Sequence, residues 1–137
     1  MLPTQIRTGP DYRLMRFAED HNDARYLIRA YASGQVTVNE DVLTNSLIVS
    51  AERLMRDWPP QCFEQLTAAH LQAAVALRPE ILLLGTGAQL RFPHPSLLAE
   101  VHNHGIGVEV MDTAAACRTY NVLVSEGRRV AAALLMT

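Results

Sequence analysis

The sequence predicts a single α/β domain with a central mixed β-sheet, formed by an antiparallel meander and a βαβ unit, with helices packed on the sheet. Three observations support this fold class. Residues 81–84 are four consecutive aliphatic residues, a pattern typical of an interior strand that is covered on both faces. A helical pattern separates them from a second apolar run, residues 108–111. Short alternating runs between residues 28 and 49 indicate antiparallel strands.

Length and composition exclude several classes of protein. A chain of 137 residues is long enough for one domain with its own core. The net charge of −2 argues against a nucleic-acid partner, because such proteins carry a basic excess or stripe. No apolar run approaches the ~20 residues of a membrane span. The two cysteines, Cys62 and Cys117, form no CxxC pair, so we expect a reduced, cytoplasmic protein.

The first half of the chain divides into an arm and a meander. Residues 1–24 are polar and carry Pro and Gly, so we expect a partly ordered arm ahead of a domain at residues 25–137. Alternating apolar residues and two turns predict a meander that belongs to the central sheet. Thr67 is the expected N-cap of a helix over residues 68–77.

The second half alternates strands and helices. Gly105 follows a helical pattern at residues 96–104 and is the expected C′ residue. Since a right-handed helical crossover joins them, the runs at 81–84 and 108–111 should be parallel neighbours. The remaining elements are a helix over residues 114–126, with Thr113 as N-cap, and a strand over residues 129–136.

The first candidate site is Gly85-Thr86-Gly87, directly after the first strand. Glycines there permit a sharp turn or close approach of a backbone or ligand. The dinucleotide fingerprint fails because Leu90 occupies its third glycine position, and no GK[ST] follows. A tight turn is favoured over a loop that recognises an anion or a backbone segment. Ligands of open α/β sheets nevertheless bind at this edge.

The second candidate is one face of the following helix. Cys117, Tyr120 and Asn121 are spaced i, i+3 and i+4, so a helix over residues 114–123 places them together. A thiol near a helix amino end and beside Arg118 can have a lowered pKa, which makes Cys117 a candidate reactive thiol. The sequence places no histidine beside it as a base, so a cysteine packed in the core is favoured.

Arg118 and Arg128 are candidates for binding an acidic group, helped by the anion-attracting amino end of the helix. A structural ion pair with Glu109, Asp112 or Glu126 is an equally good interpretation, and both stay open.

The histidines suggest no metal site. His102 and His104 are two residues apart on a helix and point in different directions, and no HExxH pattern occurs. They and His94 are expected to be solvated residues at helix ends. We therefore expect no metal, no cofactor and no established set of catalytic residues.

Three blocks of sequence carry a resemblance to a known family. They are PEILLLGTGAQ at residues 79–89, GIGVEVMDTAAACRTYNVLVSEGRRVAAALL at residues 105–135, and Gly34-x-Val36-x-Val38-Asn39 together with Trp58. They resemble the Mth938-like (DUF498) family, which includes the mitochondrial complex I assembly factor 3 type proteins. The resemblance covers residues 28–135.

The resemblance implies a compact α/β domain with a mixed sheet, and it brings no established catalytic activity. The chain starts with acidic residues such as Asp11 and Glu19 and shows no evident mitochondrial presequence, so a bacterial-type cytoplasmic protein is expected. The family's motif residues map to Gly85, Thr86, Gly87, Thr113, Ala116, Cys117, Tyr120, Asn121, Glu126 and Arg128.

These residues other than Ala116, together with Arg118, form the predicted binding surface. The leading hypothesis is a non-enzymatic binding or assembly-type domain that holds a protein partner or a small acidic ligand near the GTG loop and helix 113–123. By resemblance, the process is respiratory-complex assembly. The alternatives are a small-molecule-binding protein, an enzyme with Cys117 as reactive thiol, and a structural homo-oligomer.

Overall fold

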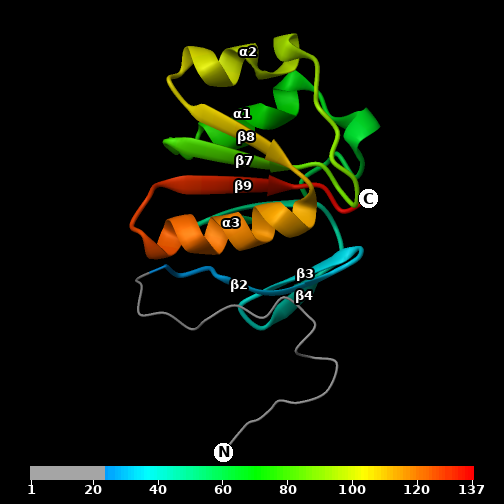
Figure 1. Cartoon of the computed structure of the whole chain (residues 1–137), viewed down its shortest axis with the longest axis vertical. Helices are drawn as coiled ribbons and strands as arrows, with labels where there is room; N and C mark the ends of the chain where they lie inside the picture. The colour runs from blue at the N-terminus through cyan, green and yellow to red at the C-terminus, as the bar shows by residue number, and fades with distance from the viewer. Residues whose placement is uncertain (1–23) are drawn as a thin grey trace, which may run out of the picture.

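A five-stranded mixed sheet lies at the centre of the structure, a computed structural model that describes residues 24–137 (Figure 1). β7 is parallel to both of its neighbours, β8 and β9, whereas β5 is antiparallel to β9 and β6. The predicted parallel pairing is therefore confirmed. In spatial order the strands are β6 (Leu54–Met55), β5 (Leu47–Ser50), β9 (Val130–Leu134), β7 (Ile81–Gly85) and β8 (Gly107–Met111).

The meander forms a separate sheet, so the expectation that it belongs to the central sheet is wrong. β2 (Ile28–Ala32), β3 (Gln35–Val38) and β4 (Asp41–Leu43) pair antiparallel in that order. Only β5, the last run of the expected meander, lies in the central sheet. The alternation of Val36 and Val38 indicates that one face of this strand is buried. It does not indicate which strands pair with it through hydrogen bonds.

The helices begin and end with recognisable caps. Thr67 and His70 form a capping box at the start of a 3₁₀ turn, η3 (Ala68–Leu71), which continues into α1 (Gln72–Val75). Gly105, with φ +76°, follows the end of α2, as expected for a C′ glycine. The bounds of the others are η2 (Phe63–Gln65), α2 (Pro95–Asn103) and α3 (Thr113–Ser125).

Asp112, and not Thr113, is the N-cap of α3. Its carboxylate accepts a hydrogen bond from Ala115 N at 2.8 Å, and its backbone is extended. Thr113 is the first helical residue, and its hydroxyl is bonded to other segments of the chain. From the sequence, Thr113 is the expected cap, but its hydroxyl binds other segments of the chain, and Asp112 caps the helix instead.

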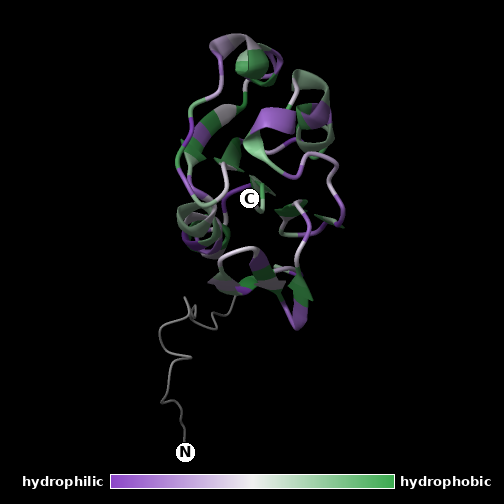
Figure 2. Cartoon of the chain, turned by 90° about the vertical axis from the view of Figure 1, so that its right-hand side faces the viewer, coloured by the Kyte–Doolittle hydropathy of each residue, from purple (hydrophilic) through white to green (hydrophobic). Residues whose placement is uncertain are grey.

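Two apolar layers sandwich the central sheet. α3 and the three-stranded sheet lie against one face, and α1 and α2 lie against the other (Figures 1 and 2). β9 is buried along its whole length; Ala131 and Ala133 belong to the cluster beneath α1 and α2, whereas Ala132 and Leu134 belong to the cluster beneath α3. Alanines in this central strand let both layers approach closely.

Asn121 joins the two sheets through α3. Its side-chain oxygen accepts from Ile28 N at 3.1 Å, and its side-chain nitrogen donates to Ile28 O at 2.6 Å, so the amide completes both backbone groups at the start of β2. One residue earlier, the Tyr120 hydroxyl donates to Tyr26 O at 2.8 Å. The helix face that the sequence predicted therefore holds β2 in place.

We predict that Asn121→Ala lowers the free energy of unfolding by about 2–4 kcal/mol, because it leaves the buried N–H and C=O of Ile28 unpaired. Urea denaturation measures the change. Val122→Ala, one residue on and exposed, is the control and should change stability by less than about 1 kcal/mol. Equal effects of the two substitutions would contradict the role assigned to Asn121.

Candidate functional site

The Thr113 hydroxyl connects three segments at the carboxyl ends of the parallel strands. Its oxygen accepts from Gly87 N at 2.8 Å and donates to Leu135 O at 2.7 Å, and Thr113 N donates to Gly87 O at 2.9 Å. The side chain has no exposed surface. These hydrogen bonds hold together the start of α3, the GTG loop and the end of β9.

Both glycines of the loop are required by close packing. A Cβ on Gly85 would lie 2.9 Å from Thr113 Oγ1 and 3.0 Å from a Leu134 methyl carbon. A Cβ on Gly87 would overlap the carbonyl group of Thr137, and Gly87 has a φ of +100°. Thr113 and the Leu134 side chain therefore approach Gly85, and the backbone of Thr137 approaches Gly87.

Thr86 organises the loop that leaves this point. Its N–H donates to Met111 O at 2.9 Å, its hydroxyl donates to Gln89 O at 2.7 Å, and the same oxygen accepts from Arg91 N at 3.1 Å. Thr86 is buried. It therefore ties the start of the loop to the carboxyl end of β8 and fixes the backbone on either side of Leu90.

The candidate thiol lies in the core. Cys117 is fully buried in the apolar cluster beneath α3, and burial raises the pKa of its thiol to about 12, with the Asp112 carboxylate adding to the effect and Arg118 opposing it. Burial likewise raises the pKa of Tyr120. The sequence argument for a lowered cysteine pKa fails here because desolvation outweighs the charge of Arg118.

The charged candidates are exposed, and two of them, Glu126 and Arg128, lie far from the GTG loop. Arg128 Nε and Nη2 lie 3.2 and 3.1 Å from Glu80 Oε2, so its ion-pair partner is Glu80, not one of the three acidic residues expected from the sequence. Glu126 is the exposed C-cap of α3, and Arg118 is exposed on the helix. The 13 residues of α3 span about 20 Å, which separates Glu126 and Arg128 from Thr113.

The structure therefore divides the predicted binding surface. Gly85, Thr86, Gly87, Thr113, Cys117, Tyr120 and Asn121 make interior contacts. Arg118, Glu126 and Arg128 are exposed, but they do not gather at one place. Because Asn121 holds β2, an Arg118/Asn121 double alanine variant would change the fold and is not a clean test of binding.

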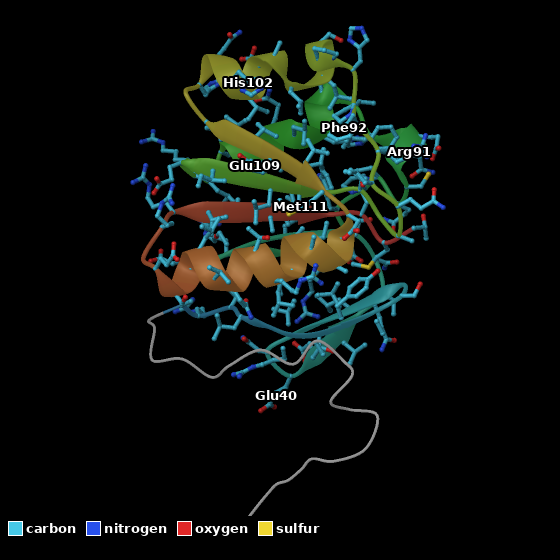
Figure 3. The ribbon with its side chains drawn as sticks, in the orientation of Figure 1. Glu40, Arg91, Phe92, His102, Glu109 and Met111 are labelled. Atoms are coloured by element: carbon cyan, nitrogen blue, oxygen red, sulfur yellow. The ribbon has the colours of Figure 1, made fainter. Side chains whose placement is uncertain are left out.

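An exposed apolar loop follows Thr86. Phe92 is 74% exposed and Leu90 is 49% exposed, and the side chain of Arg91 between them is 45% exposed. The Arg91 guanidinium lies 4.6 Å from the centre of the Phe63 ring and pairs with Glu64 at 2.8 Å. Figure 3 shows Arg91 and Phe92 on this loop. Arg91 and Thr86 hold the backbone, so Leu90 and Phe92 are presented to solvent from a fixed support.

β8 is the last strand of the central sheet on this side. Gly107 N donates to Glu80 O, and Met111 O accepts from Thr86 N, so the odd-numbered residues direct their backbone groups toward β7. Backbone groups alternate along a strand, and those of Val108 and Val110 therefore point away from the sheet. Within residues 24–137, no strand pairs with this edge. Glu109 is exposed on it (Figure 3).

We call Leu90, Phe92 and the outward edge of β8 the Phe92 surface. Sequence reasoning missed it, because the apolar pattern of β8 does not show whether that strand lies at the edge of the sheet. An aromatic residue between Arg91 and Pro93, outside any periodic pattern, was the available signal.

The histidines serve local structure. His94 Nδ1 accepts from Ser96 N at 3.1 Å and caps α2, and His104 Nδ1 lies 2.9 Å from Glu100 O. Among residues 24–137, no three His, Cys, Asp or Glu side chains gather in a way that could hold a metal ion. In the same residues, no helix has the length and apolar character needed to cross a membrane.

A sequence profile described as a protein of unknown function (DUF498/DUF598) matches residues 28–135. The chain belongs to this family. A Rhodobacter capsulatus member of unknown function is 39% identical over 108 residues, which are 79% of this chain and 82% of the relative. NADH dehydrogenase [ubiquinone] 1 alpha subcomplex assembly factor 3 of Xenopus tropicalis is 34% identical over 110 residues, 79% of this chain and 60% of that protein. The chain thus spans about three fifths of the assembly factor's length.

Solved structures of bacterial relatives share the fold of this DUF498 chain. A Bordetella parapertussis protein superposes with a TM-score of 0.78 at 40% identity, covering 82% of this chain and 96% of that chain. A Mth938-like domain of Bordetella pertussis gives a TM-score of 0.76 at 33% identity, covering 89% and 92%. The resemblance read from the sequence is confirmed. A Francisella tularensis relative, 28% identical over 89% of this chain and all of its own length, carries the name 13 kDa major membrane protein.

We predict that Thr113→Val lowers the free energy of unfolding by about 2–4 kcal/mol, since it leaves Gly87 N and Leu135 O buried without their partner. Thr113→Ser keeps the hydroxyl and loses only a methyl group, so it should cost about 1 kcal/mol. Urea denaturation of both variants measures the difference. If valine is tolerated as well as serine, the hydroxyl does not hold these segments together.

We predict that Cys117 in a Cys62→Ser variant reacts with a disulfide reagent at pH 8 roughly a thousandfold more slowly than free cysteine, because a thiol with a pKa of about 12 is almost wholly protonated there. Adding urea should release normal reactivity. Absorbance of the released thiolate follows the reaction. Reaction of the folded protein at the rate of free cysteine would restore the reactive-thiol hypothesis.

Proposed function

We propose that this chain is a non-enzymatic binding domain of the assembly-factor type, which acts in the cytoplasm and holds an extended segment of a partner protein on the Phe92 surface. The proposal rests on two observations: Phe92 is 74% exposed, and no strand within residues 24–137 pairs with the outer edge of β8. Both features expose groups that folded proteins normally cover.

The two parts of the surface supply different interactions. The N–H and C=O groups of Val108 and Val110 can pair with an added strand, which gives affinity without sequence preference. Leu90 and Phe92 supply apolar contact, and their supporting loop is already held by Thr86 and Arg91, so little order has to be imposed on binding.

Charge favours a partner other than a second copy of the chain. Pairing two β8 edges antiparallel about Glu109 would place this carboxylate opposite Glu109 of the second copy, and like charges directly opposite are destabilising. A partner strand with Lys or Arg at that position would be attracted instead. The homo-oligomer hypothesis is therefore the weaker one.

The relatives support the class of function. Vertebrate family members carry the name of a complex I assembly factor, and the match to the Xenopus protein extends over 79% of this chain. We infer by analogy that the partner is a subunit or cofactor protein of a respiratory complex. The Cys117 enzyme hypothesis has less support because the thiol is buried and its pKa is raised.

The test is affinity capture of the tagged protein from its native cells, with cytosolic and membrane fractions processed separately. We predict a partner that Phe92→Ser retains at least about tenfold less well, as expected for loss of an aromatic hot spot. The control is Val42→Ser, which removes another exposed apolar side chain, 55% exposed, from β4. Mass spectrometry identifies and quantifies the retained protein.

Hydrogen exchange with the purified partner examines the strand edge. The amides of Val108 and Val110 should gain protection on binding, whereas the surface of β4 should not. Equal retention of the partner by Phe92→Ser, or binding without protection at β8, would show that another surface is used. Light scattering that finds a stable dimer would favour self-association.

A further inference from the structure

A second candidate site lies at the amino ends of β7 and β9, whereas the GTG loop follows the carboxyl end of β7. A cleft of about 660 Å³ lies at these amino ends. It is lined by residues 50–53 at the end of β5, by residues between 76 and 79 before β7, and by the turn from α3 into β9. In Figure 1 it is the side on which α3 ends and β9 starts. This volume is in the range of about 300–1,000 Å³ that is usual for small-molecule sites.

Three arginines from two separate segments line the cleft: Arg53, Arg128 and Arg129. Glu80 organises two of them, because its carboxylate accepts from the Arg128 side chain and from Arg129 N at 3.1 Å. These bonds lower the pKa of Glu80, with the bond from Arg129 N contributing most. Glu80 therefore stays ionised and keeps Arg128 in one orientation.

The other two guanidinium groups are available for a ligand. Within residues 24–137, the structure contains no ion pair of Arg53 or Arg129. Arg53 is positioned through its backbone, with Arg53 N donating to Ser50 Oγ at 3.2 Å and Arg53 O accepting from Ser50 N at 2.8 Å. Among the described lining residues Glu52 is the one acidic residue, and Glu80 pairs with Arg128, so Arg53 and Arg129 leave the cleft with a positive excess.

The carboxyl end of α3 does not cancel this charge. Gly127 N donates to Val124 O at 3.0 Å and Arg128 N donates to Leu123 O at 3.0 Å, which is the hydrogen-bond pattern of a Schellman motif. Two of the last carbonyl groups of the helix are thus satisfied by the backbone. The same turn places Arg128 and Arg129 at the mouth of the cleft.

The rest of the lining is largely apolar. Leu77, Pro79, Val124 and Val130 contribute side chains from both layers of the fold. A free inorganic anion would leave these groups uncovered, whereas a molecule with an apolar body and one anionic group would contact both parts. Guanidinium groups recognise carboxylate, phosphate and sulfonate through paired N–H donors.

We propose that this cleft binds a small amphipathic anion, whose carboxylate or phosphate pairs with Arg53 and Arg129 and whose apolar part packs on Leu77, Pro79 and Val124. The cleft is separate from the Phe92 surface, so it is a site of its own. The sequence predicts a small acidic ligand near the GTG loop; the cleft would bind such a ligand at the amino ends of β7 and β9 instead.

The test uses the fluorescent probe 8-anilinonaphthalene-1-sulfonate, which combines an aromatic body with one sulfonate. We predict saturable binding at one site of the full chain, with at least about tenfold weaker affinity in the Arg53→Gln/Arg129→Gln variant, because two charge-assisted contacts are lost. The backbone hydrogen bonds of both residues remain in this variant, so its circular dichroism should be unchanged.

The matched control is Arg56→Gln/Arg78→Gln, which makes the same change in charge outside the cleft. It should bind the probe as the unmodified chain does, and so should Phe92→Ser, which excludes binding at the exposed loop. Decanoate should displace the probe, and inorganic phosphate at the same concentration should not. Equal loss of affinity in both arginine pairs, or displacement by phosphate alone, would overturn the proposal.

Discussion

The contact on which the fold depends is the buried hydroxyl of Thr113, which binds Gly87 and Leu135 simultaneously. In open α/β sheets the carboxyl edge of the parallel strands is the usual place for a ligand. Here the chain's own groups occupy that position, because the start of α3, the GTG loop and residues 135–137 all lie there and contact one another. The hydroxyl provides one acceptor and one donor, and the backbone uses both. The GTG loop resembles a ligand-binding loop in sequence, but in the structure it joins segments of the chain itself.

The contacts of Thr113 with Gly87 and Leu135 determine where exposed groups remain. Because α3 is fixed at its amino end, its buried face can hold β2 through Asn121 and Tyr120, and the small sheet packs as a third layer. Thr86 and Arg91 hold the loop that follows β7, and Leu90 and Phe92 on either side of Arg91 are exposed. At the other end of α3, the chain turns at Gly127 and delivers two arginines to the amino edge of the sheet. The proposed protein surface and the proposed anion site are thus consequences of the two ends of one helix.

The relatives that carry the name of an assembly factor suggest a class of function but no chemistry. The surface proposed for binding consists of exposed groups, whereas the GTG loop and the buried face of α3 make interior contacts. Packing in this chain explains several residues of the GTG and T-x-x-x-C-R-T-Y-N segments. The two glycines admit neighbouring groups at close distance, and the side chains of Thr113, Tyr120 and Asn121 form hydrogen bonds with backbone groups.

The local elements were within reach of the sequence alone. Four aliphatic residues before a glycine define β7, Gly105 ends α2, and the parallel pairing of β7 with β8 follows from the helical crossover between them. The shared face of Cys117, Tyr120 and Asn121 was also readable, since helical periodicity fixes which side chains lie together. Only the tertiary structure decided what that face contacts. Periodicity does not determine which segments contact each other, so it could not separate the meander from the central sheet or pair Arg128 with Glu80. It also could not show that no strand within residues 24–137 pairs with the outer edge of β8. Those outcomes depend on contacts between residues tens of positions apart, where burial and the need to pair every backbone group select one arrangement.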